Sequence, residues 1–592
     1  MCGIHLIVQK SKAGDENSGP ILRMIQSLEH RGPDGSGNLH LNWGDEQIWI
    51  GHNLLAISAD VKNARQPLVS EDGITGIVFN GQIYNHSELR NLLEKDGIFV
   101  KNPSDTAVLL AWIQVHGRKG LRKLEGMYAF VFWDSLKKLL IIHRDGYGIK
   151  PLFLARTRHT MAVSSEPYAL FASGLFQFSI DKKAISYYLK YKFIPPNYSP
   201  WTGLKLIPPG EVIEYWEGKP MHFQVHSERL HLKGISGRQA LDKGFSAVIP
   251  AKEPIGLLFS GGLDSTLILT WCLQNGISIK PFSIRFQGFG NQHFDDQESA
   301  RYLAEKLGVE VEWVDVGMED LANLLSFPNG KLPIVADSAW WLTNLLAQRA
   351  NEFGIRILLS GAGADEWFGG YRRHWYYHQW QKINPYFPDR WQRPILQKLK
   401  MGNPLDKSGH SQRVSELVWD AAVSSQLSGF LKNQPSLYHT HQQKSNSALQ
   451  ESLHWDQREY LPNDVLAVSD FATMAHGIEG RFPYLHPSIT NWAESFSAEE
   501  RMEGGRKHLL LQFLSPDLNE YFRKKKKHGF GVPMEALLKS QIGKSWMNEQ
   551  VLSQKEFFSN WFTEESWQEF LSKWSPEKMA QEGFALGWLS KW

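Results

Sequence analysis

The chain has 592 residues, too many for one hydrophobic core, and this length favours about three to four domains. Its 42% hydrophobic and 21% charged residues are typical of a soluble globular protein. The net charge of +2 gives no electrostatic reason to expect nucleic acid or an anionic membrane as the main partner.

The compartment can be predicted from the cysteines and the apolar runs. Two cysteines, Cys2 and Cys272, exclude a disulfide framework and favour a reducing, cytoplasmic environment. No run reaches the ~18 consecutive apolar residues of a membrane-spanning helix. A polar stretch, KSKAGDEN, follows the first short apolar run, which is unlike a signal peptide.

The first part of the chain, residues 1–200, reads as an α+β domain. Short β-branched and aromatic runs such as CGIHLIV and MYAFVFWD alternate with Gly, Asn and Asp turns, and helical patterns interrupt them at 20–30 and 86–95. This alternation predicts two layers of strands flanked by helices, an αββα sandwich. Residues 201–245, with a Pro-Pro pair and a His-rich stretch, are expected to be a linker.

From residue 246 the pattern of apolar residues changes, and this change predicts a second domain over 246–592. Apolar strands alternate with helices up to about residue 370, which indicates a doubly wound parallel sheet, an α/β class. Residues 371–592 read as a large helical extension that carries most of the Trp. Within it, the basic run RKKKK at 523–527 is either a solvated surface loop or an anion-binding lid.

Two loops of the second domain carry the clearest chemistry. SGGLDST at 260–266 follows a strand and opens a helix, so its N–H groups can bind an anion, although it is neither a Walker A loop nor a dinucleotide turn. SGAGADE at 360–366 also follows a strand and supplies a second acid. Acids at a phosphate site require a bridging metal, so we expect Mg²⁺ between Asp264 and Asp365, with two capped turns as the plainer reading.

SGGLDST resembles the pyrophosphate loop of the ATP-pyrophosphatase group. Together with SGAGADE, MAHGIEGRFPYL, GRKHLL and KKHGFGVP, it is similar to the synthetase domain of glutamine-dependent asparagine synthetases. The resemblance implies ATP and Mg²⁺, activation of a carboxylate as an acyl-adenylate, and attack by ammonia. It implies that Lys507 stabilises negative charge, that pyrophosphate is held by the loop, and that four residues line the nucleotide. These loop residues are Ser260, Gly261, Gly262, Asp264 and Ser265, and the nucleotide-lining residues are Phe259, Ile284, Ser360 and Gly361.

The first domain resembles the N-terminal-nucleophile glutaminase of the same family. MCGI, HRGPDG, GHNLLAI, NGQIYNH, SDT and RDGYGIKPLF match it in order. By itself Cys2 could be an ordinary buried thiol, but in this setting it is expected to be the nucleophile. After removal of Met1, its own α-amine would act as base. The side chain of Asn80 and the N–H of Gly81 would form the oxyanion hole.

Three positions depart from the family pattern. Leu54 stands where members usually have an Arg for the glutamine α-carboxylate, and Gln82 replaces an acid near the α-ammonium, whereas Asp105, the other ammonium partner, is kept. Arg65, nearby in sequence, is a candidate substitute for the missing cation. Ala362 replaces an acidic or otherwise functional side chain at the acceptor site. We therefore hypothesise an intact nucleophile with a weakened or altered donor pocket, with neutral drift as the alternative.

The sequence thus predicts a ligase of asparagine synthetase type that amidates a carboxylate with ammonia from glutamine, aspartate being the family default. The alternative is a specialised amide synthetase acting on another carboxylate, for which Ala362 and the Trp pair of DSAWWL at 337–342 are the pointers, although core packing also explains the pair. A regulatory relic that binds ATP without turnover is a third reading, and a tRNA-modifying role is disfavoured by the neutral charge. The expected partners are small molecules, with neither nucleic acid nor membrane, and the resemblance also allows a homodimer.

Overall fold

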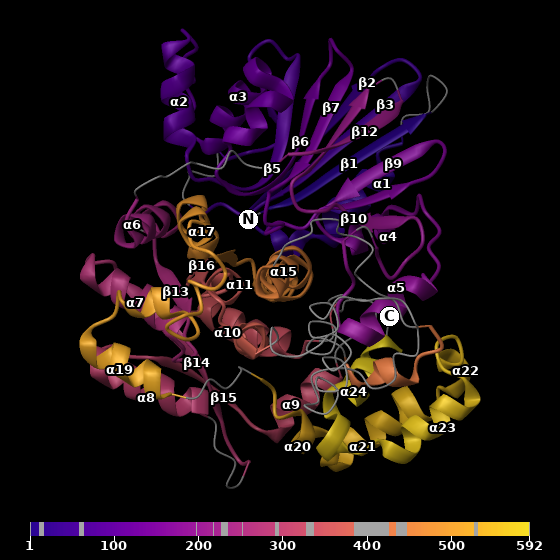
Figure 1. Ribbon diagram of the computed structural model, residues 1–592. Helices are drawn as coiled ribbons and strands as arrows, with labels where there is room; N and C mark the ends of the chain where they lie inside the picture. The colour runs from indigo at the N-terminus through magenta and orange to yellow at the C-terminus, as the bar shows by residue number, and fades with distance from the viewer. Residues whose placement is uncertain are drawn as a thin grey trace.

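The structure is a computed structural model. It describes residues 2–10, 17–57, 64–196, 198–216, 218–225, 235–250, 253–289, 295–326, 335, 337–383, 425–433, 447–525 and 531–590. Its first half, residues 2–225, and its second half, residues 235–590, lie one above the other, with the N-terminus between them (Figure 1).

The first half contains antiparallel strands and five α-helices among the described residues. The strands are β1 (Gly3–Lys10), β2 (Gly35–Asn42), β3 (Glu46–Leu54), β4 (Leu68–Val69), β5 (Thr75–Ile83), β6 (Gly126–Asp134), β7 (Leu139–Arg144), β8 (Phe153–Arg156), β9 (Thr160–Ser164), β10 (Leu204–Leu206), β11 (Glu211–Trp216) and β12 (Lys219–Gln224). The helices are α1 (Gly19–Ser27), α2 (His86–Lys95), α3 (Asp105–Gly120), α4 (Pro167–Ser173) and α5 (Lys182–Tyr191).

These strands form two packed sheets, which confirms the predicted sandwich. One sheet has the order β10-β8-β9-β1-β3-β2 and the other β12-β11-β7-β6-β5-β4. Alternate apolar side chains of β1, such as Ile4 and Leu6, meet those of β5 and β6 in a core between the sheets. Helices α1 and α4 cover the outer face of the first sheet, and α2 and α3 cover that of the second. Helices α1 and α2 lie where the apolar periodicity places them.

The stretch expected to be a linker, 201–245, is largely ordered into the sandwich. Strand β10 pairs with β8, and β11 pairs with β7 and β12, so the two sheets extend to Gln224. The sequence looked irregular here because Pro208 and Pro209 separate short strands at a tight turn, in which Gly210 has a φ of +72°.

The second half begins with α6 and is built on a parallel sheet of order β15-β14-β13-β16-β17. Its elements up to the third strand are α6 (Gly237–Val248), β13 (Ile255–Leu258), α7 (Leu263–Gln274), β14 (Ile279–Phe286), α8 (Asp295–Leu307) and β15 (Glu312–Val316). These are followed by α9 (Met318–Leu325), α10 (Ala339–Glu352), β16 (Ile357–Leu359), α11 (Ala364–Phe368) and α12 (Arg372–Ile383). Helices α7 and α8 pack on one face and α10 on the other, which confirms the doubly wound class.

The remaining described elements are mainly helical, as expected. They include α15 (Ala448–Trp455), the π-helical η6 (Asp456–Val465), α16 (Leu466–Met474), β17 (Glu479–Arg481), α17 (Pro487–Glu494), α18 (His508–Leu511), α19 (Pro516–Lys524), α20 (Met534–Lys539), α21 (Gln541–Met547), α22 (Lys555–Phe558), α23 (Glu564–Lys573) and α24 (Pro576–Leu589).

The Trp pair of DSAWWL lies in the core of this extension. Trp340 is fully buried and Trp341 is nearly so, and the ring of Trp340 packs against those of Phe471 and Trp588. The packing interpretation of the pair therefore holds. Helix α5 of the first half joins the same core, since Tyr188 donates its hydroxyl hydrogen to the carbonyl oxygen of Ala585.

The two halves share a packed contact. Met127 and Ile149 of the first half belong to the same buried cluster as the α7 and α17 side chains of the second. The hydroxyls of Tyr147 and Thr490 also lie 2.7 Å apart across this contact. Among the described helices, none is both long enough and apolar enough to cross a membrane.

Candidate functional site

The first candidate site surrounds Cys2 at the start of β1. The Cys2 side chain is 7% exposed, and its backbone N–H donates to Asn80 Oδ1 over 2.9 Å. Burial raises the pKa of the thiol, so the side chain needs a base to ionise near neutral pH. If Met1 is removed, the Cys2 nitrogen that is hydrogen-bonded to Asn80 becomes a free α-amine. This amine belongs to the same residue as the thiol and can act as the required base.

Asn80 and Gly81, which are predicted to form an oxyanion hole, are neighbours on β5. Asn80 is fully buried, and its Nδ2 has no hydrogen-bond partner among the described residues. A buried amide donor without a partner costs free energy unless a ligand fills it. Gly81 has a φ of +149°, and a Cβ there would overlap the Met127 carbonyl, so only glycine fits.

A cavity of about 390 Å³ opens beside Cys2, and the three residues predicted for glutamine recognition line it. Leu54 ends β3 and is 4% exposed, so its position in the cavity is apolar. Asp105, in the first turn of α3, accepts the N–H of Ile83 over 3.0 Å, and burial raises the pKa of its carboxyl. Gln82 Oε1 is buried and has no partner in the described part of the chain. Two acceptors suited to an ammonium group therefore remain.

The cation that would face an α-carboxylate is not supplied by Arg65. Its side chain is exposed and is not among the residues that line the cavity, whereas its neighbours Ala64 and Gln66 are. Residues 58–63, which follow Leu54 closely, lie outside the described residues.

Two lining residues that the sequence did not reveal come from the second half of the chain. Glu479 and Arg481, on β17, line the same cavity as Cys2. Arg481 Nε donates to Glu479 over 2.6 Å, and its Nη1 donates to the carbonyl of Val248 over 2.8 Å. Both residues belong to the motif GIEGRF. The one sequence signal for them is that they alternate along a strand, which places both side chains on the same face.

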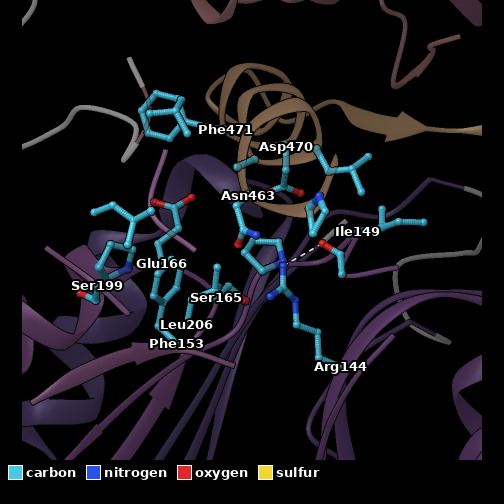
Figure 2. Close-up of a pocket in the computed structure, with 18 of the residues that line it drawn as sticks. Arg144, Ile149, Phe153, Ser165, Glu166, Ser199, Leu206, Asn463, Asp470 and Phe471 are labelled. Atoms are coloured by element: carbon cyan, nitrogen blue, oxygen red, sulfur yellow. Dashed lines mark hydrogen bonds between the residues drawn. The ribbon is translucent and has the colours of Figure 1, made fainter. Parts of the chain in front are cut away.

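A buried ionic cluster also joins the halves next to Cys2. Arg31 is fully buried and donates through Nη1 to Glu166 and to Asp470, over 2.8 Å in each case. Its Nε lies 3.4 Å from the Cys2 carbonyl oxygen. Arg31, Glu166 and Asp470 line a second cavity of about 90 Å³, between first-half strands and α16. Figure 2 shows Asp470 reaching into this cavity from one side, with Arg144 and Ser165 on the other.

The second candidate site lies at the carboxyl ends of β13 and β16, where the strand order of the parallel sheet reverses. This is the position at which doubly wound sheets bind ligands. After β13, Gly261 has a φ of +65° and Gly262 is the N-cap of α7. The loop therefore leads directly into a helix N-terminus, where its N–H groups can bind an anion. Ser265 Oγ donates to the Gly262 carbonyl over 3.2 Å. The two motif loops are thus neighbours, as predicted.

Lys507 joins the two acids of this site. Its Nζ lies 2.5 Å from Asp264 Oδ2 and 2.7 Å from Asp365 Oδ1, and the side chain is buried. Burial alone would lower the pKa of Lys507, but the two carboxylates outweigh it and raise the pKa. One ammonium group therefore balances two acids that would otherwise repel each other.

The two carboxylates fit a Mg²⁺ ion carried in with phosphate. Mg²⁺ is commonly bound by one or two carboxylates plus substrate phosphate oxygens, and both acids approach one point. Among the described residues there is no cluster of three or more His, Cys, Asp or Glu side chains suited to a metal. The pair thus suits a metal that the substrate helps to hold, not an all-protein cage.

The predicted nucleotide-lining residues lie around the same sheet edge. Phe259 directly follows β13, and its N–H donates to the carbonyl of Phe282 on β14, the strand that carries Ile284. Ser260 Oγ accepts the N–H of Gly262 over 3.3 Å. The Ser360 N–H donates to the Arg481 carbonyl over 3.0 Å, and Gly361 lies against Asp264 so closely that a Cβ would contact the Asp264 side chain at 2.8 Å.

Two further predictions concern Ala362 and the basic run. Ala362 is partly buried against the apolar cluster of the second half and places only a methyl group beside this site. Lys525 Nζ donates to the carbonyl of Gly261 over 3.2 Å, which supports the lid interpretation of the run over the solvated loop. Residues 526–530, with the rest of the run and most of KKHGFGVP, lie outside the described residues.

Strand β17 links the two candidate sites. Glu479 lines the cavity of Cys2, Arg481 accepts the N–H of Ser360, and Tyr484 donates its hydroxyl to the carbonyl of Asp264 over 3.0 Å. Tyr484 is five positions after Glu479, so their Cα atoms are at most about 17 Å apart. The two candidate sites are therefore close together at this strand.

The chain is similar to known proteins over nearly its whole length. A glutamine amidotransferase domain model matches residues 1–225, and an asparagine synthase model matches residues 237–590. Asparagine synthetase [glutamine-hydrolyzing] 1 of Bacillus subtilis is 28% identical, over 92% of this chain and 88% of that protein. A putative asparagine synthetase [glutamine-hydrolyzing] of Mycobacterium tuberculosis is 26% identical, over 91% and 89%. The chain therefore belongs to the asparagine synthase family, with a glutamine amidotransferase domain ahead of the synthase domain.

Proposed function

We propose that Cys2 releases ammonia from glutamine and that the site of Asp264, Asp365 and Lys507 uses ATP to activate the carboxylate that this ammonia attacks. The observation that carries the proposal is the pair of acids held together by Lys507 beside the pyrophosphate loop, joined through β17 to the cavity of Cys2. Aspartate is the default carboxylate, because the curated relatives are named asparagine synthetases.

At the first site, the chemistry is a thiol attack on a carboxamide. The Cys2 thiolate would add to the γ-carbonyl carbon of glutamine while the α-amine takes the thiol proton. Asn80 Nδ2 and the Gly81 N–H would donate to the oxygen that becomes negative. Collapse would expel ammonia and leave a thioester, which water would hydrolyse to glutamate.

At the second site, the chain supplies positioning and charge. When bound, Mg²⁺ would supply positive charge that offsets the phosphate oxygens of ATP. The carboxylate oxygen of the acceptor could then attack the α-phosphorus, with pyrophosphate as the leaving group. Asp264 and Asp365 would hold the metal, and Lys507, displaced from between them, would face the phosphates. The N–H groups of Gly261 and Gly262 and the Ser260 hydroxyl would bind pyrophosphate. Attack of ammonia on the activated carboxylate would give the amide and AMP.

A second candidate function differs in the acceptor. The methyl group of Ala362 can neither accept a proton nor fix an incoming amine, which favours a carboxylic acid other than free aspartate. The apolar Leu54 likewise favours weak glutamine binding. A pyrophosphate-release screen of carboxylic acids, each with glutamine or ammonium, separates the candidates: under the second, aspartate gives the slower release.

Small molecules are the proposed partners, in a cytoplasmic setting and as a homodimer. The two cysteines are both free and both buried, which suits a reducing compartment. Light scattering of the purified protein measures the dimer directly, and a monomeric mass at micromolar concentration would refute that part.

A further inference from the structure

The chain segment at the end of β3 presents apolar side chains to the cavity beside Cys2. The consecutive residues of this segment that line the cavity are Leu54, Leu55, Ala56 and Ile57. Leu54 and Leu55 are each 4% exposed. The backbone N–H of Ala56 is already engaged, since it donates to Asp34 Oδ2 over 2.9 Å. A carboxylate held against this segment would therefore lose its water without gaining an ion pair from it, which is costly.

The basic residues that line the same cavity are engaged by other groups. Arg481 is the one arginine or lysine among the described lining residues. Its Nε donates to Glu479 over 2.6 Å and its Nη1 to the carbonyl of Val248 over 2.8 Å, so a carboxylate of the same strand balances its charge. Nδ1 of His86 lies 2.9 Å from the Ile83 carbonyl oxygen, so it donates its hydrogen there. Within the described lining, both basic side chains are thus held by the protein itself.

The remaining polar groups around the cavity suit a side-chain carboxamide and an ammonium group. Asn80 Nδ2 is a buried donor and Gln82 Oε1 a buried acceptor, and neither has a hydrogen-bond partner among the described residues. Asp105 supplies a carboxyl group to the same lining. The volume of about 390 Å³ falls within the roughly 300–1,000 Å³ of pockets that enclose drug-sized molecules. A substituent larger than a carboxylate therefore has room beside the apolar segment.

We propose that the preferred donor at Cys2 is a glutaminyl compound whose α-carboxyl group is a neutral amide, and that free glutamine is the poorer donor. The α-amide lies against the apolar segment, the ammonium group at Asp105 and Gln82, and the side-chain carboxamide at Cys2. The thiolate adds to the γ-carbonyl carbon, the γ C–N bond breaks, and ammonia leaves with the thiol proton. Water then hydrolyses the thioester to a γ-carboxylate, and the α-amide is unchanged. The proposal rests on the proposed function, since it names the donor class of the same site.

The test measures kcat/KM for ammonia release by the full-length protein from four donors. They are L-glutamine, its α-(N-methylamide), the tripeptide glutaminyl-alanyl-alanine and N-acetyl-L-glutamine. In each of them the side chain is the one primary amide, so the ammonia reports on that bond. The assay is run at about pH 7, where an α-amine with a pKa of about 7.7–8.0 is still mostly protonated. Cys2→Ala supplies the background rate.

We expect kcat/KM for the α-(N-methylamide) to exceed that for glutamine by at least about tenfold, because the neutral group avoids an unpaired buried charge. A still higher value for the tripeptide would identify a peptide as the source of the amide, and a lower one a small molecule. N-acetyl-L-glutamine, which keeps the carboxylate and lacks the ammonium group, should be the poorest donor. Leu54→Arg should reverse the preference toward glutamine, whereas Leu54→Met, which stays apolar, should keep it.

Glutamine that equals or exceeds both α-amides in the unsubstituted protein overturns this proposal and leaves the proposed function standing. N-acetyl-L-glutamine that equals glutamine also overturns it, because the ammonium group is then not recognised. If none of the four donors releases ammonia above the Cys2→Ala background while ammonium chloride supports amide formation, the donor half of the proposed function fails, and this proposal fails with it.

Discussion

Cys2 and Asn80 allow the two half-reactions to be separated by single substitutions. Cys2→Ala should abolish glutamate formation and glutamine-driven synthesis while ammonium-driven synthesis continues, because the thiol acts only on glutamine. Asn80→Ala should slow glutamate formation by about 10²–10³, the cost of one oxyanion donor. Steady-state assays with each nitrogen source check both. Loss of ammonium-driven synthesis in Cys2→Ala would show that the two sites are not independent.

Leu54, which lines the cavity of Cys2, is proposed to weaken the binding of free glutamine. A desolvated carboxylate without its cation loses ~3–5 kcal/mol, so Leu54→Arg should lower the KM for glutamine by about tenfold or more. Leu54→Met, which stays apolar, is the matched control and should leave KM unchanged. An ordinary micromolar-to-millimolar KM in the unsubstituted protein, or no response to the Arg, counts against the altered pocket.

Individual residues were predictable where a local motif contained their chemistry. SGGLDST and SGAGADE gave Asp264 and Asp365, because acids in a Gly-rich phosphate loop need an explanation that does not depend on the fold. The lysine between them and Asp105 came from resemblance alone. Arg31 and Glu479 were not assigned a place, because a buried charge pair formed by residues about 440 positions apart leaves no periodic trace.

At the level of elements, the turn after α11 controls the position of Lys507. Gly370 packs so tightly that a Cβ would overlap both Asp365 Oδ1 and Lys507 Cε. Gly370→Ala should therefore reduce amide formation from either nitrogen source by at least about tenfold, while glutamate formation is retained. Gly317→Ala, where a Cβ meets only Asp320 at 3.6 Å, is the control. An unchanged rate of amide formation in Gly370→Ala would mean that the side chains of Asp365 and Lys507 move aside at little cost.

The strand β7 contributes a pH-dependent term to stability through His143. Burial lowers its pKa to about 4 from 6.5, and its ring contacts the Tyr128 hydroxyl and the Glu211 carbonyl. Because the pKa of His143 is lower in the folded protein, its contribution to the free energy of unfolding is complete above the pKa of the unfolded chain. This contribution is lost as pH falls from about 6.5 to about 4. His143→Gln should flatten the fall of Tm over that window in a calorimetric series, and a slope identical to that of the parent would contradict the assignment.

The positions of helices and strands could be predicted from local sequence pattern more reliably than the elements that each of them packs against. The helices at 19–27 and 86–95 and the parallel strands follow from periodicity. Strands β10 to β12 were missed because short strands beside Pro-rich turns look irregular until their neighbours in the sheet are known. Helix α5 packs with the second half through a buried face that sequence alone does not assign to a partner.

The whole molecule places a nucleophile and an ATP-type site on either side of one contact. That relation depends on β17, a three-residue strand whose role is defined by pairing with β16 and by facing Cys2. The sequence could indicate two domains in order, but the route between them depends on long-range packing.

The most direct test of the account follows nitrogen from glutamine to product. The protein is incubated with ATP, Mg²⁺, a carboxylic acid and glutamine labelled with ¹⁵N in its side-chain amide, and pyrophosphate, glutamate and labelled amide are measured together. The account predicts carboxylate-dependent pyrophosphate release with the label in the amide product, and loss of the label transfer in Cys2→Ala. Binding of ATP without carboxylate-dependent pyrophosphate release, for aspartate and every other acid tested, would contradict it.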